Sequence, residues 1–287
     1  MAFVNSYKHL YTVKQICKVI KFPRSTYYEA LAHEPSKREI EYKKFAKQVK
    51  DAFFENKQIY GAIKLHRILN IEGIPCSLKR VQRHMKSQGL RSIVIKKYRH
   101  QSEKGIIPDN KENILKQDFT ATTINQKWCT DITYIHVLGE GWTYLASVMD
   151  LYNRKIIGYA YGKTMTTELA LKAVENACMN VSDTKGIILH SDLGSQYTSQ
   201  LFEKYMLQKE MLHSFSRKGN PYDNACIESF HSVLKKEEVY LNTYQNFEDA
   251  QRAIFKYIES WYNRKRIHSA INYMTPQQKE DEALKVA

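Results

Sequence analysis

The sequence Trp128-Cys129-Thr130-Asp131-Ile132-Thr133-Tyr134-Ile135 is rich in β-branched and aromatic residues and carries one acid in its middle. This composition is typical of a β-strand that is at least half buried. Burying a carboxylate is costly unless the group is paired with another charge or bound to a cation. We therefore expect Asp131 to have a function beyond folding.

Two further acids stand in comparable positions. A second apolar run, residues 186–191, ends at Asp192, and a helix-patterned stretch that begins near Tyr222 contains Glu228. Three carboxylates that converge would form an oxygen cage for hard divalent ions. Such a cage is suited to cutting and rejoining phosphodiester bonds.

The pattern around these acids predicts an alternation of strands and helices. We expect strands at 127–137, 142–152, 155–161, 186–190 and 211–216, and helices at 166–179, 199–209, 222–240 and 248–263. The short links between the first three strands indicate antiparallel neighbours. This order predicts an α/β fold with a mixed five-stranded sheet, as in ribonuclease H-like domains. In that fold the first strand lies beside the fourth, so Asp131 and Asp192 should meet, and the next helix can place Glu228 alongside.

The helix that carries Glu228 holds two more candidates. Asn224, Glu228 and Lys235 are spaced by four and seven residues, so they share one helix face. Lys235 could hold a phosphate near the carboxylates, and Asn224 could orient the loop or a ligand. A solvated helix charge is an equal alternative for Lys235. His190 and His231 are expected to pack or form hydrogen bonds rather than to act in catalysis.

The excess positive charge of the chain lies in its front part. Residues 1–120 contain 25 Lys and Arg against 11 Asp and Glu, which accounts for the whole net charge of +14. Residues 121–287 hold 19 of each sign. This asymmetry predicts a front that binds a polyanion and a back that is electrically balanced. A merely solvated basic surface is the alternative.

The first 36 residues have the pattern of a helix-turn-helix. A helix from Tyr11 to Ile20 is followed by a break at Pro23 and by a second helix, for which Ser25 is a plausible N-cap. The candidates for DNA contact at the start of this second helix are Arg24, Ser25 and Thr26.

Residues 37–98 repeat this organisation as a second helix-turn-helix domain. Helices are expected at 38–56, 60–69 and 78–88, with Ser77 as the N-cap of the last one and Gly89 at its end. In a helix-turn-helix the second helix lies in the major groove while basic side chains hold phosphates. The candidates here are Lys79, Arg80, Arg83 and Lys86. An ordinary amphipathic helix with a solvated basic face is the alternative.

The remaining features of the sequence concern domain bounds, localisation and cysteine usage. Residues 99–122 are interpreted as a basic linker and 123–280 as the catalytic domain. No apolar run approaches the roughly 18–20 residues that span a bilayer, and the N-terminus has no signal-peptide pattern. We expect a cytoplasmic protein without a membrane partner, associated with the nucleoid when bound to DNA. Five scattered cysteines without a Cys-x-x-Cys pair argue against a disulfide framework and a zinc ribbon.

Several motifs together resemble the transposases of the insertion-sequence-three family. The likeness is to the product of the second reading frame, the OrfB type, which is related to retroviral integrases. It covers nearly the whole chain. The motifs are residues 125–134, His190 through Ser199, residues 216–225, Glu228-Ser229-Phe230 through Leu234-Lys235, Tyr262-Asn263 with Arg266, His268 and Ser269, Tyr60-Gly61 and Lys79-Arg80-Val81.

The resemblance implies an Asp-Asp-Glu transposase, a polynucleotidyl transferase that uses two Mg²⁺ or Mn²⁺ ions. Asp131, Asp192 and Glu228 would be the ligands, and Lys235 would contact DNA. It also implies double-stranded DNA as partner, both element terminal repeats and target, with a joined-end circular intermediate. A homo-oligomer on paired ends and cooperation with the upstream reading frame product would follow. Leu193 stands where many relatives carry Arg, which removes one DNA contact.

Two other functions stay open at this point. The chain could be a non-catalytic DNA-binding regulator of transposition, in which the basic front binds DNA and the back forms oligomers. It could also be a ribonuclease H-type nuclease that acts on hybrids. The two helix-turn-helix patterns argue against the nuclease, because recognition of a hybrid by shape needs no helix in the major groove.

Overall fold

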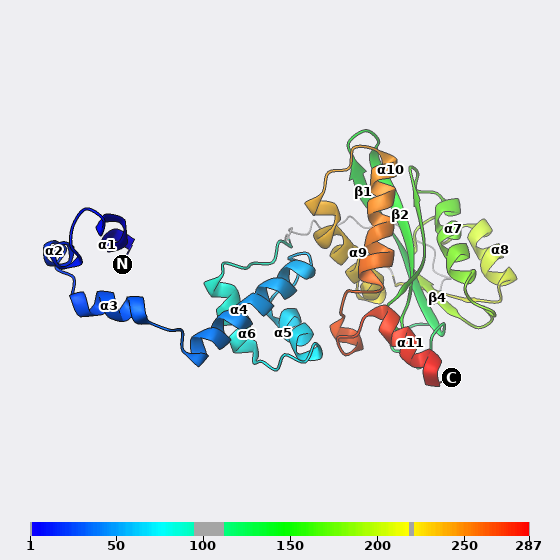
Figure 1. Cartoon of the computed structure of the whole chain (residues 1–287). Helices are drawn as coiled ribbons and strands as arrows, with labels where there is room; N and C mark the ends of the chain where they lie inside the picture. The colour runs from blue at the N-terminus through cyan, green and yellow to red at the C-terminus, as the bar shows by residue number, and fades with distance from the viewer. Residues whose placement is uncertain (1, 95–111, 218–220, 287) are drawn as a thin grey trace. The chain divides into compact units, whose positions relative to one another are not determined.

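The computed structural model of the chain describes residues 2–94, 112–217 and 221–286 (Figure 1). It divides into two compact units, Met1–Ser92 and Ile93–Ala287. The finer domain boundaries expected from the sequence stay predictions, and most of the expected basic linker, residues 99–111, lies outside the described residues. Within the described residues, no helix is both long and apolar enough to cross a membrane.

The first three helices form a small cluster in the first unit: α1 (Ala2–Tyr7), α2 (Val13–Val19) and α3 (Arg24–Ala32). Their buried residues are Val4, Ile16, Cys17 and Tyr27. The N-cap of α3 is Pro23, so the prediction of Ser25 as the cap was wrong. Pro23 has an extended backbone, with φ −61° and ψ 127°, and the helix begins directly after it. Ser25 therefore lies inside the first turn.

The other three helices of this unit surround a second core: α4 (Lys37–Glu55), α5 (Ala62–Ile71) and α6 (Leu78–Ser87). Val49 of α4, Leu65 of α5 and Val81 of α6 are fully buried. Helix α6 starts where expected, because the Ser77 hydroxyl accepts a hydrogen bond from the Arg80 backbone N–H at 3.3 Å. Such a cap satisfies a donor that the first turn leaves open.

The second unit is built on the expected five-stranded mixed sheet. Its strands are β1 (Lys127–Val137), β2 (Gly141–Asp150), β3 (Ile156–Gly162), β4 (Ile188–Ser191) and β5 (Leu212–Phe215). Their order in the sheet is β3-β2-β1-β4-β5. The β1–β2 and β2–β3 pairs are antiparallel, whereas β1–β4 and β4–β5 are parallel. The first strand therefore lies beside the fourth, as predicted.

Helices cover both faces of this sheet (Figure 1). Side chains that alternate along β1 and β2, among them Trp128, Ala146 and Val148, share a core with α7 (Thr167–Cys178) and α8 (Gln200–Gln208). The opposite face meets α9 (Ala225–Glu237), where His231 contacts both β1 and β2. Short 3-10 turns, Pro221–Asn224 and Val239–Leu241, flank α9, so the α-helix is shorter than the expected 222–240.

The last part of the chain forms hydrogen bonds to the end of α9. Helix α10 (Phe247–Lys256) continues into a π-helical segment, Tyr257–Tyr262, and α11 (Pro276–Val286) follows. The buried Glu237 carboxylate at the end of α9 accepts hydrogen bonds from the Arg266 guanidinium at 2.9–3.0 Å and from the Tyr257 hydroxyl at 2.9 Å. A buried carboxylate that is paired in this way is satisfied, so it fixes the helix without leaving an uncompensated charge.

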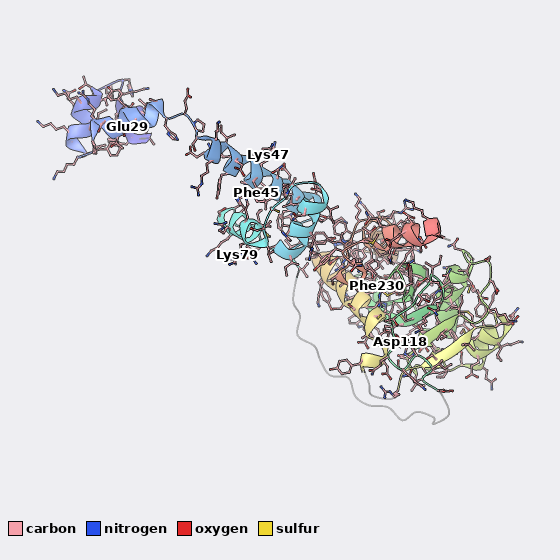
Figure 2. All side chains as sticks on the ribbon, turned by 90° about the horizontal axis from the view of Figure 1, so that it is seen from below. Glu29, Phe45, Lys47, Lys79, Asp118 and Phe230 are labelled. Carbon is pink, nitrogen blue, oxygen red and sulfur yellow. The ribbon has the colours of Figure 1, made fainter. Side chains whose placement is uncertain are left out.

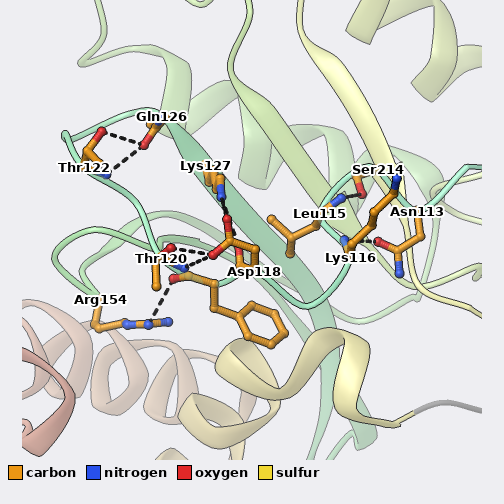
Figure 3. A network of polar contacts seen from close by, with 11 residues as sticks. Asn113, Leu115, Lys116, Asp118, Thr120, Thr122, Gln126, Lys127, Arg154 and Ser214 are labelled. Carbon is orange, nitrogen blue, oxygen red and sulfur yellow. Dashed lines mark hydrogen bonds and ion pairs between the residues drawn. The ribbon is translucent and has the colours of Figure 1, made fainter.

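The segment that leads into β1 is part of the second unit (Figure 3). The Phe215 N–H donates to the Glu112 carbonyl at 3.0 Å, and the Leu115 N–H donates to the Ser214 hydroxyl at 2.9 Å. Leu115 itself is buried. Farther along, the Lys127 ammonium donates to the Asp118 carboxylate at 2.7 Å. Residues 112–118 thus pack along β5 and β1.

We predict that Gly158→Ala destabilises the second unit. A Cβ at Gly158 of β3 would lie 2.4 Å from the Ala173 carbonyl oxygen and 2.5 Å from the Ala177 nitrogen, both backbone atoms of α7. Forcing strand and helix apart should lower the free energy of unfolding by about 1–3 kcal/mol, measured by chemical denaturation. Gly162→Ala in the same strand is the control, because its new Cβ would meet a mobile Leu169 methyl group at 3.0 Å. Equal effects of the two substitutions would contradict the prediction.

Candidate active site

The register of the sheet brings two of the predicted acids to the same level. In the parallel β1–β4 pair, Lys127 lies opposite Ile188 and Cys129 lies opposite His190. Extending this register by two residues places Asp131 level with Asp192. Neighbouring strands are about 4.8 Å apart, so the two residues start from adjacent positions. Because β4 ends at Ser191, Asp192 stands at its carboxyl end, where the β1 edge is no longer covered.

Asp131 is held by a chain of hydrogen bonds that reaches into the sheet. Its Oδ1 accepts from the Ile132 N–H at 2.8 Å, and its Oδ2 lies 3.3 Å from His231 Nδ1. His231 Nε2 lies 2.8 Å from the Ser147 hydroxyl. Ser147 is the cross-strand partner of Asp131 on β2 and is fully buried. With Nδ1 donating to the carboxylate and the hydroxyl donating to Nε2, this chain sets the direction of the Asp131 side chain.

This arrangement accounts for both histidines discussed from the sequence. His231 is buried and forms hydrogen bonds, as expected, but its partner is a predicted site residue. His190 is buried between the Ser214 and Ser216 hydroxyls, at 2.9 and 3.0 Å. Burial lowers the pKa of His190 to about 4, against the opposing effect of Asp223. His190 is therefore a neutral residue that joins β4 to β5.

The charges of the other two acids affect the pKa of Asp192. Its Oδ1 accepts from the Gly194 N–H at 3.0 Å. Although Asp192 is an exposed residue, the surroundings of its carboxyl raise the pKa to about 6. Surrounding protein reduces the hydration of the carboxyl, and this is the largest cause of the raised pKa, followed by the charge of Asp131 and, more weakly, that of Glu228. Asp131, Asp192 and the half-buried Glu228, in the first turn of α9, thus belong to one electrostatic environment.

Asn224 and Lys235 both lie beside Asp131. The buried Asn224 amide donates to the Thr130 carbonyl at 3.1 Å, which ties the start of α9 to β1. Lys235 is half-buried, and burial lowers its pKa while the charge of Asp131 opposes that shift. Its ammonium lies 5.8 Å from the centre of the Tyr134 ring. Lys235 is therefore not a fully solvated helix charge.

One residue of this region was missed in the sequence. The buried Asp223 carboxylate accepts hydrogen bonds from the Gln117 amide at 2.6 Å, the Asn113 amide at 2.9 Å and the Arg217 N–H at 2.7 Å. Burial alone would raise its pKa, but these donors and the Arg217 guanidinium lower it to about 2. Asp223 thus fastens the chain immediately before α9. No sequence signal reveals it, because two of its partners lie more than a hundred residues away.

The donor set suits a hard divalent cation in its chemistry. Carboxylate oxygens are the ligands that Mg²⁺ prefers, and three anionic groups that act on one another would be relieved by a cation. The buried Asn224 Oδ1 also has no hydrogen-bond partner among the described residues. The side-chain directions differ from a closed cage: within the described residues, no group of three potential ligands has the geometry to hold a metal ion. Asp131 is turned to His231, and Asp192 is turned to its own loop.

The predicted DNA-contacting residues of the first unit are placed as follows. Lys79, Arg83 and Lys86 of α6 are exposed, and Figure 2 shows Lys79 at the surface of the helix. Arg80 is half-buried instead, because it donates to Glu41 of α4 at 2.8 Å and lies 4.1 Å above the Phe45 ring. In α3, Arg24, Ser25 and Thr26 are all exposed in the first turn.

We predict that Asp192→Asn stabilises the metal-free protein at neutral pH. The pKa of the Asp192 carboxyl is about 6 in the folded protein, against an ordinary value of 3.8, so the folded protein binds a proton there more tightly than the unfolded chain does. The stability gained from this protonation is fully present below about pH 4. It is lost as the pH rises through about 6. The melting temperature of Asp192→Asn should therefore exceed that of the parent at pH 7.5, and the gain should vanish at pH 4. Asp183→Asn is the control, because the Asp183 Oδ1 accepts a comparable N–H bond, from Lys185 at 2.9 Å. A lower melting temperature of Asp192→Asn at pH 7.5 would contradict the prediction.

Comparison with known protein families divides the chain in a similar way. Residues 40–98 match the HTH-like domain family. Residues 121–221 and 209–276 match two families that are both described as an integrase core domain. The second unit therefore contains an integrase core from the start of β1 to the beginning of α11.

Curated relatives match almost the whole chain. The transposase for insertion sequence element IS904 of Lactococcus lactis is 38% identical over 84% of this chain and 95% of its own length. The transposase InsF for insertion sequence IS3A of Escherichia coli is 35% identical over 98% of both chains. Among solved structures, the catalytic core domain of HTLV-2 integrase in complex with magnesium matches 56% of this chain and 99% of its own, at 14% identity and a TM-score of 0.44. With relatives of this identity along its length and an integrase core built on the sheet described above, the chain belongs to the insertion-sequence IS3 family of transposases, which are polynucleotidyl transferases.

Proposed function

We propose that Asp131, Asp192 and Glu228 form the catalytic centre of a DNA strand-transfer enzyme of the Asp-Asp-Glu type. The observation that carries this proposal is the β1–β4 register, which brings Asp131 level with Asp192 at an uncovered strand edge. The effect of Asp131 and Glu228 on the pKa of Asp192 supports it from electrostatics. The direct consequence is an anionic centre within residues 121–287, where 19 acidic residues, these three included, balance 19 basic ones.

The cofactor proposed for this centre is a pair of Mg²⁺ or Mn²⁺ ions. Asp131, Asp192 and Glu228 would hold them, with Asn224 as a supporting residue and Lys235 contacting a DNA phosphate. Bound there, such ions would supply activation of an attacking oxygen and stabilisation of a leaving one in an in-line displacement. To complete the cage, the Asp192 carboxylate has to turn from its contact with the Gly194 N–H. Asp131 can keep its bond to His231 through one oxygen while the other faces the centre.

The proposed reaction has two displacements at phosphorus. In the first, a water oxygen forms a bond to the phosphorus at an element end, and the bond to the 3′ oxygen breaks to give a 3′-hydroxyl. In the second, that 3′-hydroxyl attacks a target phosphodiester, and the target 3′ oxygen leaves. Each displacement exchanges one phosphorus–oxygen bond for another, so joining the strands needs no external energy source. One centre can perform both because only the nucleophile differs.

The first unit is proposed to bring double-stranded DNA to this centre. Helix α6 presents three exposed basic residues, and the charge of the chain is concentrated in its front part. Arg80 stays a proposed DNA contact as well, and its guanidinium also donates to Glu41 and lies above the Phe45 ring, which joins α4 to α6. The partners proposed are the element's terminal repeats, the target DNA, further copies of this chain on paired ends and the upstream reading frame product. A non-catalytic regulator of transposition remains the second candidate, and the following experiment separates the two.

We predict that Asp192→Asn abolishes metal-dependent cleavage without loss of DNA binding. Nicking of plasmid DNA with Mg²⁺ or Mn²⁺ should fall by more than about 100-fold, beyond the range typical of a substituted outer-shell residue. Asp183→Asn should cleave like the parent, because it keeps the same type of backbone contact at an exposed site. Equal cleavage by Asp192→Asn and the parent would refute the assignment. No cleavage by the parent at any metal concentration, with binding intact, would favour the regulator.

The basic residues of α6 give a second prediction. Lys79→Ala, Arg83→Ala and Lys86→Ala should each weaken binding to a mixed-sequence duplex and lower the slope of log K against log salt by about 1. The control is Lys47→Ala, which removes an exposed lysine of α4 (Figure 2). Filter binding over a range of salt concentrations measures both quantities. An unchanged slope for all three α6 substitutions would show that this helix does not contact phosphates.

A further inference from the structure

The outer end of the β1–β2 hairpin carries a cluster of aromatic residues, most of them exposed. We call it the hairpin patch, and it consists of the exposed Tyr134, His136 and Trp142 and the half-buried Tyr144. The strand register pairs Tyr134 with Tyr144 and His136 with Trp142. Side chains alternate between the two faces of a strand, and all four of these residues have the same parity as Ala146 and Val148. They therefore lie on the sheet face that α7 covers farther along the strands. At the patch itself this cover is missing, and Trp142 is 61% and Tyr134 50% exposed.

Exposure of this kind is unusual for tryptophan in this chain. The other two tryptophans, Trp128 and Trp261, are buried. Cross-strand aromatic pairs do stabilise a hairpin. The side of the Trp142 ring that faces solvent, however, contributes no hydrophobic stabilisation, because it is not buried. The ring contacts within the patch are edge-to-face, with interplanar angles of 78°, 67° and 80°. None of these contacts is a parallel stack, so the rings do not cover one another face to face.

One side chain connects the patch to the proposed catalytic centre. Tyr134 follows Asp131 by three residues in the same strand, about 10 Å at 3.3 Å per residue, and this odd spacing places the two side chains on opposite faces of the sheet. Lys235 bridges the two, because its ammonium lies 5.8 Å from the Tyr134 ring centre while the charge of Asp131 acts on it. Lys235 is therefore the element that can lead a DNA strand from the carboxylates to the ring of Tyr134.

We propose that the hairpin patch binds unpaired DNA bases beside the phosphate that reacts at Asp131 and Asp192. This inference rests on the proposed function of that centre and adds a ligand to it. Aromatic side chains next to a cation are the usual means of holding single-stranded nucleic acid, since bases stack on the rings and the cation attracts the backbone. Tyr134 with Lys235 has this composition, and Trp142 provides the largest exposed ring.

The ligand is unpaired because of the geometry of stacking. Inside a duplex both faces of each base are covered by neighbouring bases, so a protein ring can stack only on an end or on a base that has left the helix. A second copy of this chain is the other possible occupant of an exposed aromatic surface. The adjoining ammonium of Lys235 favours the anionic ligand, since its positive charge complements a phosphate.

Trp142 provides a direct readout of binding. It is the one tryptophan of the three that is exposed, so acrylamide should quench its emission selectively. We expect a duplex with a short single-stranded tail to shield Trp142 from acrylamide in the full chain without metal. A blunt duplex of the same sequence should leave the quenching unchanged. This measurement involves no turnover, so it does not depend on catalysis.

Affinity gives the second readout. Stacking contributes about 1–3 kcal/mol per base, so Trp142→Ala should weaken binding of the tailed duplex by about 5- to 150-fold. Binding of the blunt duplex should stay within about twofold, and Trp142→Phe should retain most of the affinity because it keeps a ring. Phe255→Ala is the matched control, since Phe255 is 56% exposed on α10. Melting temperatures of the variants would report any loss of folding.

The outcomes separate this inference from the proposed function. Equal weakening of tailed and blunt duplexes by Trp142→Ala would overturn the stacking role. Shielding of Trp142 in the parent that rises with protein concentration in the absence of DNA, together with a dimer that the parent forms and Trp142→Ala does not, would assign the patch to contact between copies. Asp192→Asn should keep the preference for tailed DNA while cleavage is lost. If Asp192→Asn cleaves like the parent, the proposed centre fails whatever the patch binds.

Discussion

The parallel pairing of β1 with β4 is the contact on which the rest of the second unit depends. It involves only three residues of β1, and it ends two residues before Asp131. This short pairing fixes the level of Asp192 and leaves the following part of the β1 edge open. Helix α9 is held against the same strand through Asn224 at its start and His231 in its middle, and Glu237 at its end ties it to Arg266. The sheet register therefore sets the relative level of Asp131 and Asp192, and α9 packs against the strand that carries Asp131.

Much of this arrangement could be predicted from local sequence. The acid within an apolar β-type run, the acid at the end of a second run and the order of strands and helices were sufficient to place Asp131 beside Asp192. The N-cap at Ser77 was also recognisable, because a cap acts within three residues of itself. The family resemblance, which rested on several motifs at once, was confirmed by relatives that match nearly the whole chain.

The features that could not be predicted arise from contacts between distant residues. The Ser147 to His231 bond spans 84 positions, and the Asn113 to Asp223 bond spans 110. No periodicity or capping rule relates such pairs. The cap of α3 was misplaced for a different reason, since Ser25 has the better side chain but Pro23 already has the extended backbone from which the helix starts. The sequence of α6 also does not show that its basic residues differ in exposure. Arg80 packs against Glu41 and Phe45, whereas its basic neighbours are exposed.

The segment before β1 limits how this protein can be divided into modules. The integrase core match begins at residue 121, but Leu115 is buried and Asn113 and Gln117 supply two of the donors to Asp223. A fragment cut at residue 121 would expose an apolar hole beside β5 and leave a buried carboxylate with only Arg217. A stable fragment of the integrase core is therefore expected to begin at or before Glu112, so that this connecting segment belongs with the core rather than with the helices of the first unit.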